Sequence, residues 1–355
     1  MAKKQAALML EDGTLFRGES MGLEQEVFGE VVFNTAMVGY QEILTDPACH
    51  GEIVVMTYPL MGNTGFSPDR DESDGMWAKG LVVKELCDYP SHWNNSVMDT
   101  DEYLSKRGVS GIQGLDTRAV ALHIREYGSM IGVLSTVLDK DVLFKHLERY
   151  KRRQGDLVRD VTPKPYRLEG HGKKVAVVDL GAKRSMIKAL HDLGCDVYGF
   201  GREDAKKGLA DLNPDGILIS SGPGDPERVE GVRGIIETWM GKKPMLGVGL
   251  GYQLMGLVLG GETRQMIFGH HGVNHPVRCL KTGKLITTSQ NHNYVLEFED
   301  VKSVETTYVN LNDQTLEGFA QPELSMTGVQ FYPETVDNHS DTDGIYKAFV
   351  RSLED

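Results

Sequence analysis

The stretch Lys174-Val175-Ala176-Val177-Val178-Asp179 decides the fold of the second half of the chain. Its unbroken run of β-branched and small apolar residues predicts a parallel strand that is buried on both faces. A helix is expected next, over residues 183–193, with Gly194 at its end. Further apolar runs follow at 196–200, 216–219 and 244–248. Strands that alternate with helices predict a parallel α/β sheet.

The loops after the strands ending at Ile219 and Val248 are the candidate site, because ligands bind such sheets beyond the carboxyl ends of the strands. Loop 220–226 places two glycines around a proline, which lets backbone amides approach a ligand but also fits an ordinary turn. Residues 247–253 have the pattern of a nucleophile elbow, a tight turn that raises one side chain at the start of a helix, expected over 254–259. The raised residue is Gly249, which has no side chain. A phosphate loop is a weaker interpretation, because the G-x-G-x-x-G spacing and a Walker lysine are missing.

The first half of the chain has a different pattern, with short strands and turns. Residues 7–16 enclose the turn Glu11-Asp12-Gly13 and predict a hairpin, and residues 30–33 and 51–56 predict further strands. A helix is expected over 116–127, because it begins with an acidic cap and is followed by a glycine. This half is therefore predicted to be a mixed β/α domain.

A length of 355 residues suggests about two domains. The segment from about 149 to 172 is polar, basic and proline-containing without apolar periodicity, which is typical of a linker. The predicted organisation is a first domain at 1–150, a linker at 151–172 and a second domain at 173–355.

Composition excludes several classes of function. Lys and Arg total 38 against 51 Asp and Glu, a net charge of −13, which argues against nucleic acid and anionic membranes as partners. No apolar run approaches the ~20 residues that cross a bilayer, and residues 1–5 lack the apolar core of a signal peptide. A cytoplasmic location is therefore expected.

The cysteines and histidines do not predict a metal site. Four scattered cysteines, Cys49, Cys87, Cys195 and Cys279, indicate reduced thiols instead of a disulfide or zinc framework. The histidine-rich stretch 269–276 has no carboxylate or cysteine at ligand spacing, so a turn packed against the site is expected there.

Several motifs together resemble one family. In the first half they are the stretches 29–35, 39–47, 58–63 and 114–119. In the second half they are 221–226, 247–253, 268–272, 290–292 and 330–334. Through these motifs the chain resembles, nearly end to end, the small subunit of carbamoyl-phosphate synthetase. The C-terminal half of that subunit is a class I glutamine amidotransferase domain, with helices on both faces of a parallel-rich sheet.

The resemblance implies a reaction and a partner. In the family, a cysteine at the elbow attacks the amide of glutamine, a histidine accepts the thiol proton, and a glutamate orients the histidine. Ammonia then passes to a large synthetase subunit and reacts with ATP-activated bicarbonate, which gives carbamoyl phosphate for arginine and pyrimidine synthesis. The resemblance implies no cofactor on this chain, since ATP would bind the large subunit.

The sequence departs from the family pattern at the catalytic positions. The nucleophile position is Gly249 and the base position is Tyr332, so that only Glu334 of the triad remains. Tyr252 stands where the elbow usually has a histidine. Pocket positions that differ are Ala48 for serine, Asn293 for glycine and Tyr294 for a similar aromatic residue. Pocket positions that match are Gly222, Gly224, Leu250, Gln253 and Asn291.

These departures predict negligible glutaminase activity. Without a thiol at Gly249 no thioester can form, and a tyrosine with its ordinary pKa of about 10 is no base at neutral pH. Tyr252 and Tyr332 either fill the former glutamine pocket or line a new one. Three functions stay open: a non-hydrolytic partner of an ammonia-using large subunit, a pocket repurposed for another small molecule or reaction, and an ordinary glutamine-hydrolysing small subunit.

Overall fold

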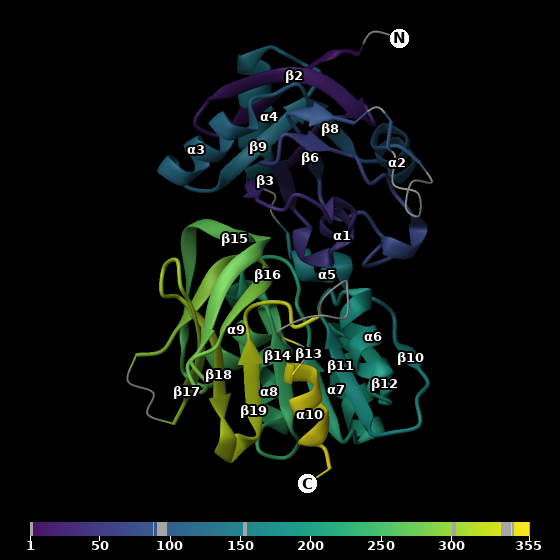
Figure 1. Ribbon diagram of the computed structural model, residues 1–355, viewed down its shortest axis with the longest axis vertical. Coiled ribbons are helices and arrows are strands. Elements are labelled where there is room, and N and C mark those ends of the chain that lie inside the picture. The colour runs from purple at the N-terminus through teal and green to yellow at the C-terminus, as the bar shows by residue number, and fades with distance from the viewer. Residues whose placement is uncertain are drawn as a thin grey trace. The chain divides into compact units, whose positions relative to one another are not determined.

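The computed structural model describes residues 3–87, 89–90, 98–151, 155–299, 303–334, 342 and 344–354. The chain divides into two compact units, one of residues 1–155 with 267–272 and one of residues 156–266 with 273–355 (Figure 1). Each unit has its own core and is described separately below.

The first unit is built on a closed barrel with the strand order β1-β2-β8-β6-β4-β3-β9. The strands are β1 (Gln5–Leu10), β2 (Leu15–Gly22), β3 (Val27–Asn34), β4 (Glu52–Met56), β6 (Gly80–Val82), β8 (Ser110–Gln113) and β9 (Met130–Ser135). The predicted hairpin is confirmed, since β1 and β2 pair antiparallel with Met9 opposite Leu15. The other two predicted strands are confirmed as β3 and β4, which pair in parallel.

Helices and two short strands complete the first unit. They are α1 (Tyr40–Thr45), α2 (Thr100–Arg107), α3 (Thr117–Tyr127), α4 (Lys140–Lys151), β5 (Leu60–Met61) and β7 (Glu85–Leu86). The predicted helix is confirmed as α3, because the Asp116 side chain accepts a hydrogen bond from the Ala119 amide and Gly128 follows with a φ of 95°. Val120 and Ile124 on one face of α3 are buried against the barrel strands.

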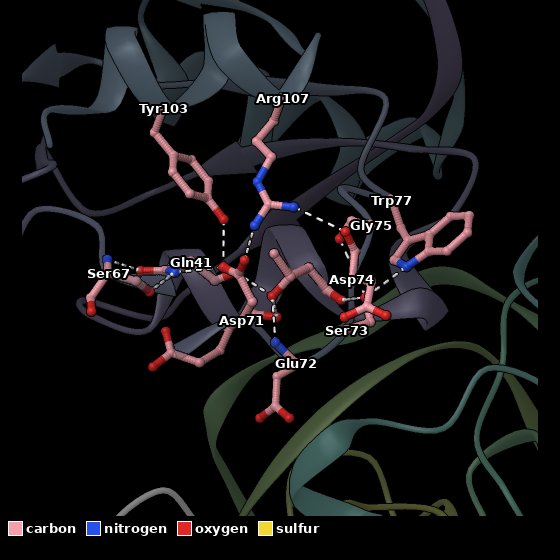
Figure 2. A network of polar contacts seen from close by, with 12 residues as sticks. Gln41, Ser67, Asp71, Glu72, Ser73, Asp74, Gly75, Trp77, Tyr103 and Arg107 are labelled. Carbon is pink, nitrogen blue, oxygen red and sulfur yellow. Dashed lines mark hydrogen bonds and ion pairs between the residues drawn. The ribbon is translucent and has the colours of Figure 1, made fainter. Parts of the chain in front are cut away.

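A buried polar network fixes α1 to the segment 67–77 in the first unit (Figure 2). The Asp71 carboxylate accepts hydrogen bonds from the Gln41 amide at 2.6 Å and the Tyr103 hydroxyl at 2.5 Å, and it pairs with Arg107. Arg107 also donates to the Asp74 carbonyl at 2.9 Å. Because Asp71 is buried, these donors supply the compensation that a buried carboxylate needs.

The second unit contains one ten-stranded sheet with the order β10-β12-β11-β13-β14-β19-β18-β17-β15-β16. Its parallel part is β12 (Asp196–Gly201), β11 (Lys174–Asp179), β13 (Gly216–Ile219), β14 (Met245–Val248) and β19 (Met326–Val329). The remaining strands are β10 (Tyr166–Leu168), β15 (Glu262–Cys279), β16 (Leu285–Glu297), β17 (Glu305–Asn310) and β18 (Leu316–Gln321). The four strands predicted from apolar runs are therefore confirmed as the centre of a parallel sheet.

Helices cover both faces of this sheet, as predicted. One apolar cluster packs α7 (Arg202–Leu212), α8 (Val232–Trp239) and α9 (Leu250–Val258) against Val178, Ile217 and Ile219. A second cluster packs α6 (Arg184–Asp192) and α10 (Gly344–Arg351) against Val175, Val177 and Leu218. Alternate residues of one strand thus enter opposite cores, which is why these strands are apolar without interruption.

The structure corrects three expectations. The helix after the elbow begins at Leu250, earlier than 254, because it starts directly behind the turn residue. The histidine-rich stretch 269–276 is no turn but part of the long strand β15, which lies between β16 and β17 in the sheet. The segment expected to be a linker contains α5 (Leu157–Val161) and β10, and β10 pairs with β12 at the sheet edge. Residues 152–154 of that segment lie outside the described residues.

No helix within the described ranges is long and apolar enough to cross a membrane. The four cysteines are free thiols.

Candidate functional site

Gly249 forms the sharp turn that joins β14 to α9. Its φ is 57° and its ψ is −114°, a conformation that strains any residue with a Cβ. Two hydrogen bonds fix the turn: the Gly249 amide donates to the Val329 carbonyl at 2.9 Å, and the Gly249 carbonyl accepts from the Gln253 amide at 3.1 Å. The backbone therefore has the geometry of a nucleophile elbow, whatever residue stands at its tip.

The space beside Gly249 lies between two other loops of the site. A Cβ placed on Gly249 would lie 3.3 Å from the Ser221 Cβ and 3.9 Å from the Gln330 carbonyl oxygen. A small side chain fits there after a shift of a few tenths of an ångström. Steric exclusion by the neighbouring atoms therefore does not explain why position 249 is a glycine.

Loop 220–226 packs directly on the first turn of α9. A Cβ on Gly222 would lie 2.4 Å from the Leu180 carbonyl oxygen and 2.9 Å from a Leu250 methyl group, so only glycine fits at this position. Gly224, two residues further, has a φ of 88° and is exposed. The structure therefore places Gly222 directly against Leu250.

An amide network connects α9 to the neighbouring strands. The Gln253 amide nitrogen donates to the Tyr294 carbonyl at 2.8 Å and to the Gln330 side-chain oxygen at 2.9 Å. Tyr294 lies on β16 together with Asn291 and Asn293, which are half-buried and, being two residues apart, project from the same face of the strand. Gln253 of α9 thus contacts Tyr294 directly, and Asn291 and Asn293 lie on the same strand as Tyr294.

Tyr332 and Glu334 lie just beyond the carboxyl end of β19 and meet Lys183. The Lys183 ammonium nitrogen is 4.5 Å from the centre of the Tyr332 ring and 3.5 Å from the Glu334 Oε1 atom. The other Glu334 oxygen, Oε2, accepts a hydrogen bond from the Tyr346 hydroxyl at 2.8 Å. All four side chains are buried. Tyr332 therefore presents the face of its ring to a charged neighbour.

Tyr252 lies elsewhere. Its side chain is completely buried in the core on the other face of the sheet, with its ring 5.3 Å from Phe319 and its hydroxyl 3.1 Å from the Leu316 carbonyl oxygen, to which it donates. Burial raises the pKa of Tyr252 well above its ordinary value. Tyr332 belongs to the opposite core. The two tyrosines therefore neither fill nor line one pocket together, in contrast to both alternatives considered from the sequence.

Ala48 is part of the first unit. It lies in the short 3₁₀ helix η1 (Pro47–Cys49), where its amide donates to the Asp46 carboxylate at 2.9 Å. The methyl group is buried and offers no hydrogen bond.

Lys183 is the site residue that the sequence interpretation missed. It follows β11, and Asp179 at the end of that strand holds the loop: its Oδ1 accepts from the amides of Gly181 and Ala182, and its Oδ2 accepts from the Tyr166 hydroxyl at 2.8 Å. Burial raises the pKa of Asp179 despite these bonds. The signal was available, because a lysine in the loop that follows β11 lies at the same sheet edge as the other site loops.

The arrangement limits the chemistry of the site. Helix α9 begins directly behind the elbow, and the amides at a helix start can in general stabilise an oxyanion, but the turn residue supplies no nucleophile. The carboxylate of Glu334 is engaged by Lys183 and Tyr346.

The fold and the elbow define a class of protein, the class I glutamine amidotransferases, and the profile described as "Glutamine amidotransferase class-I" matches residues 176–352. The profile "Carbamoyl-phosphate synthase small chain, CPSase domain" matches residues 8–134.

Similar proteins agree with both profiles. The carbamoyl phosphate synthase small chain of Listeria innocua is 41% identical over 98% of this chain and 96% of its own length. That of Aquifex aeolicus is 43% identical over 98% of this chain and 99% of its own length. The carbamoyl phosphate synthase pyrimidine-specific small chain of Bacillus subtilis is 39% identical over 98% of this chain and 95% of its own length. The chain therefore belongs to the carbamoyl-phosphate synthase small-chain family.

Proposed function

We propose that this chain is a small chain that hydrolyses no glutamine and acts as the non-hydrolytic partner of a synthetase large subunit that uses free ammonia. The observation that carries this proposal is Gly249 at the tip of the elbow. A thioester needs a thiol at this point, and glycine has none. Loss of the nucleophile in comparable hydrolases lowers turnover by roughly 10⁴–10⁶-fold.

The residue at 332 supports the same conclusion. Its ring contacts the Lys183 ammonium group, and a phenol is a poor proton acceptor at neutral pH. Because nucleophile and base act as one unit, losing both costs little more than losing one. We infer that the rest of the site supports only binding.

The presence of a complete-looking small-chain domain in the first unit supports a large subunit as the partner. The small-chain profile covers most of the barrel unit, and relatives named as small chains match over nearly the whole of this chain. ATP and bicarbonate would bind the large subunit, and the product would be carbamoyl phosphate for arginine or pyrimidine synthesis. No cofactor is proposed for this chain.

The test is a synthesis assay on the purified pair. The chain and the large subunit from the same organism are co-expressed and purified, and carbamoyl phosphate is measured with ammonium or glutamine as the nitrogen source. We expect a stable complex that makes the product from ammonium and not from glutamine. Glutamine-dependent synthesis, or the lack of any complex, would contradict the proposal.

A repurposed pocket has weaker support in the form suggested by the sequence. One of its two expected tyrosines, Tyr252, is enclosed in the core. The surroundings of Tyr332 do suggest a specific binding property, which is developed next.

A further inference from the structure

The ammonium group of Lys183 lies between an aromatic face and a carboxylate. Its nitrogen is 4.5 Å from the centre of the Tyr332 ring and 3.5 Å from Glu334 Oε1. A cation over an aromatic face is attracted by the ring quadrupole, and the attraction grows when water is excluded. The Lys183 and Glu334 side chains are only 10% and 4% exposed, so water is largely excluded here.

The groups around this ammonium come from separate elements and are held independently of it. The Tyr332 amide donates to the Ser289 carbonyl at 3.0 Å, which fixes the backbone that carries the ring. The Tyr346 hydroxyl on α10 donates to Glu334 Oε2 at 2.8 Å, which fixes the carboxylate. Lys183 reaches the same point from the start of α6. The ring and the carboxylate would therefore keep their positions if the lysine side chain were shortened.

We propose that the Tyr332 ring and the Glu334 carboxylate form a binding site for one primary ammonium group, which the chain fills with its own Lys183. The carboxylate supplies the countercharge and the ring supplies a second, uncharged wall. A strongly hydrated sodium ion suits this environment less well than an ammonium ion, and a tetramethylammonium ion has no N–H group to donate to the Glu334 carboxylate. The free ligand of the site is therefore ammonium or a small primary alkylammonium ion, in competition with Lys183.

The test is chemical rescue of a shortened lysine. The variant Lys183→Ala leaves a buried carboxylate without its cation, and its thermal unfolding midpoint should fall by roughly 5–15 °C. Ammonium or methylammonium chloride should then raise the midpoint beyond the change that the same salt causes in the unaltered chain. At a tenfold excess over the dissociation constant, the rise should be roughly 3–6 °C. Equal concentrations of sodium or tetramethylammonium chloride should give no such rise.

Two matched variants separate a site from a general salt effect. Lys183→Met fills the space of the lysine stem, and ammonium should not rescue it. Tyr332→Leu combined with Lys183→Ala removes the aromatic wall and should weaken the rescue at least severalfold. Equal stabilisation of all three variants, or of Lys183→Ala by sodium, would overturn the proposal.

A second measurement applies if Lys183→Ala fails to fold. In ¹H–¹⁵N spectra of the lysine ammonium groups of the full chain, Lys183 should give a protected signal, shifted upfield by the Tyr332 ring. The shift should disappear in Tyr332→Leu, and an unshifted, rapidly exchanging signal in the unaltered chain would contradict the site. Because every group belongs to this chain, the result does not depend on the proposed large-subunit partner.

Discussion

At the scale of single residues, the elbow separates backbone geometry from chemistry. Gly249 holds a φ of 57° and a ψ of −114°, which costs an ordinary residue about 1–3 kcal/mol. Enzymes of this kind accept that cost because the strained residue carries the nucleophile. Glycine adopts this turn without the strain, so the turn forms whether or not a catalytic side chain is present.

This reasoning predicts that Gly249→Ala lowers the free energy of unfolding by about 1–3 kcal/mol, as measured by denaturant unfolding. The matched control is Gly234→Ala in α8, where a Cβ meets nothing within 4 Å and φ is not positive. That substitution should stabilise the protein by about 0.5–1 kcal/mol. Equal effects at both positions would show that the elbow backbone relaxes when a side chain is added.

At the scale of elements, an ion pair joins the edge strand β10 to β12. Arg167 donates to both oxygens of Asp196 at 2.9 Å, and these bonds lower the pKa of Asp196 to about 2. A carboxyl group with a lowered folded pKa stabilises the fold above its unfolded pKa and loses that contribution as the pH falls. The edge strand that the sequence did not reveal is thus held in part by a pH-dependent contact.

We therefore predict that loss of this ion pair lowers the free energy of unfolding by about 1 kcal/mol between about pH 4 and pH 2. This figure is reduced because Arg167 is exposed and solvent screens the pair. Asp196→Asn should remove this part of the pH dependence and lower stability at pH 7. The control is Asp192→Asn, whose ion pair with Lys188 is exposed on α6 and should contribute little. An unchanged pH profile in Asp196→Asn would contradict the prediction.

A second prediction at this scale concerns the polar network of the first unit. Asp71→Asn removes the charge that pairs with Arg107 and one of the oxygens that receive hydrogen bonds (Figure 2). Unfolding of this unit should become easier by about 2–3 kcal/mol, as measured by hydrogen exchange of α1 and α2. The neighbouring exposed Asp69→Asn should change stability by less than about 0.5 kcal/mol. Similar effects of the two substitutions would argue against the network as the main link.

At the scale of the whole molecule, local patterns predicted the elements but not all of their partners. The apolar run at 174–179 and the capped segment at 116–127 carry their own signals, so β11 and α3 were predicted correctly. Strand β10 was missed because it is short and pairs with β12, about 30 residues further along the chain. Strand β15 pairs with β16 and β17, which follow it closely, and it was missed because its Gly-, His- and Pro-containing stretch 269–276 has the composition of a turn.

For the site, the loops were predictable from the sequence, but the directions of the side chains were not. The rule that ligands bind beyond the carboxyl ends of parallel strands directed attention to loops 220–226 and 247–253, and Gly222 of the first loop does pack against Leu250 of the second. Which side chain enters which core was not predictable, and therefore Tyr252 was expected in the pocket and Lys183 was overlooked. Sequence proximity to a motif does not determine the direction in which a side chain points.

The most direct test of the central claim is the release of ammonia from glutamine by the purified chain, compared with its own variant Gly249→Cys/Tyr332→His. We predict that the unaltered chain shows no turnover above the uncatalysed background, and that any activity appears only when the thiol and the imidazole are present. A rate in the unaltered chain within about tenfold of that of an active class I glutamine amidotransferase would contradict the account, because deleting a nucleophile should cost roughly 10⁴-fold or more.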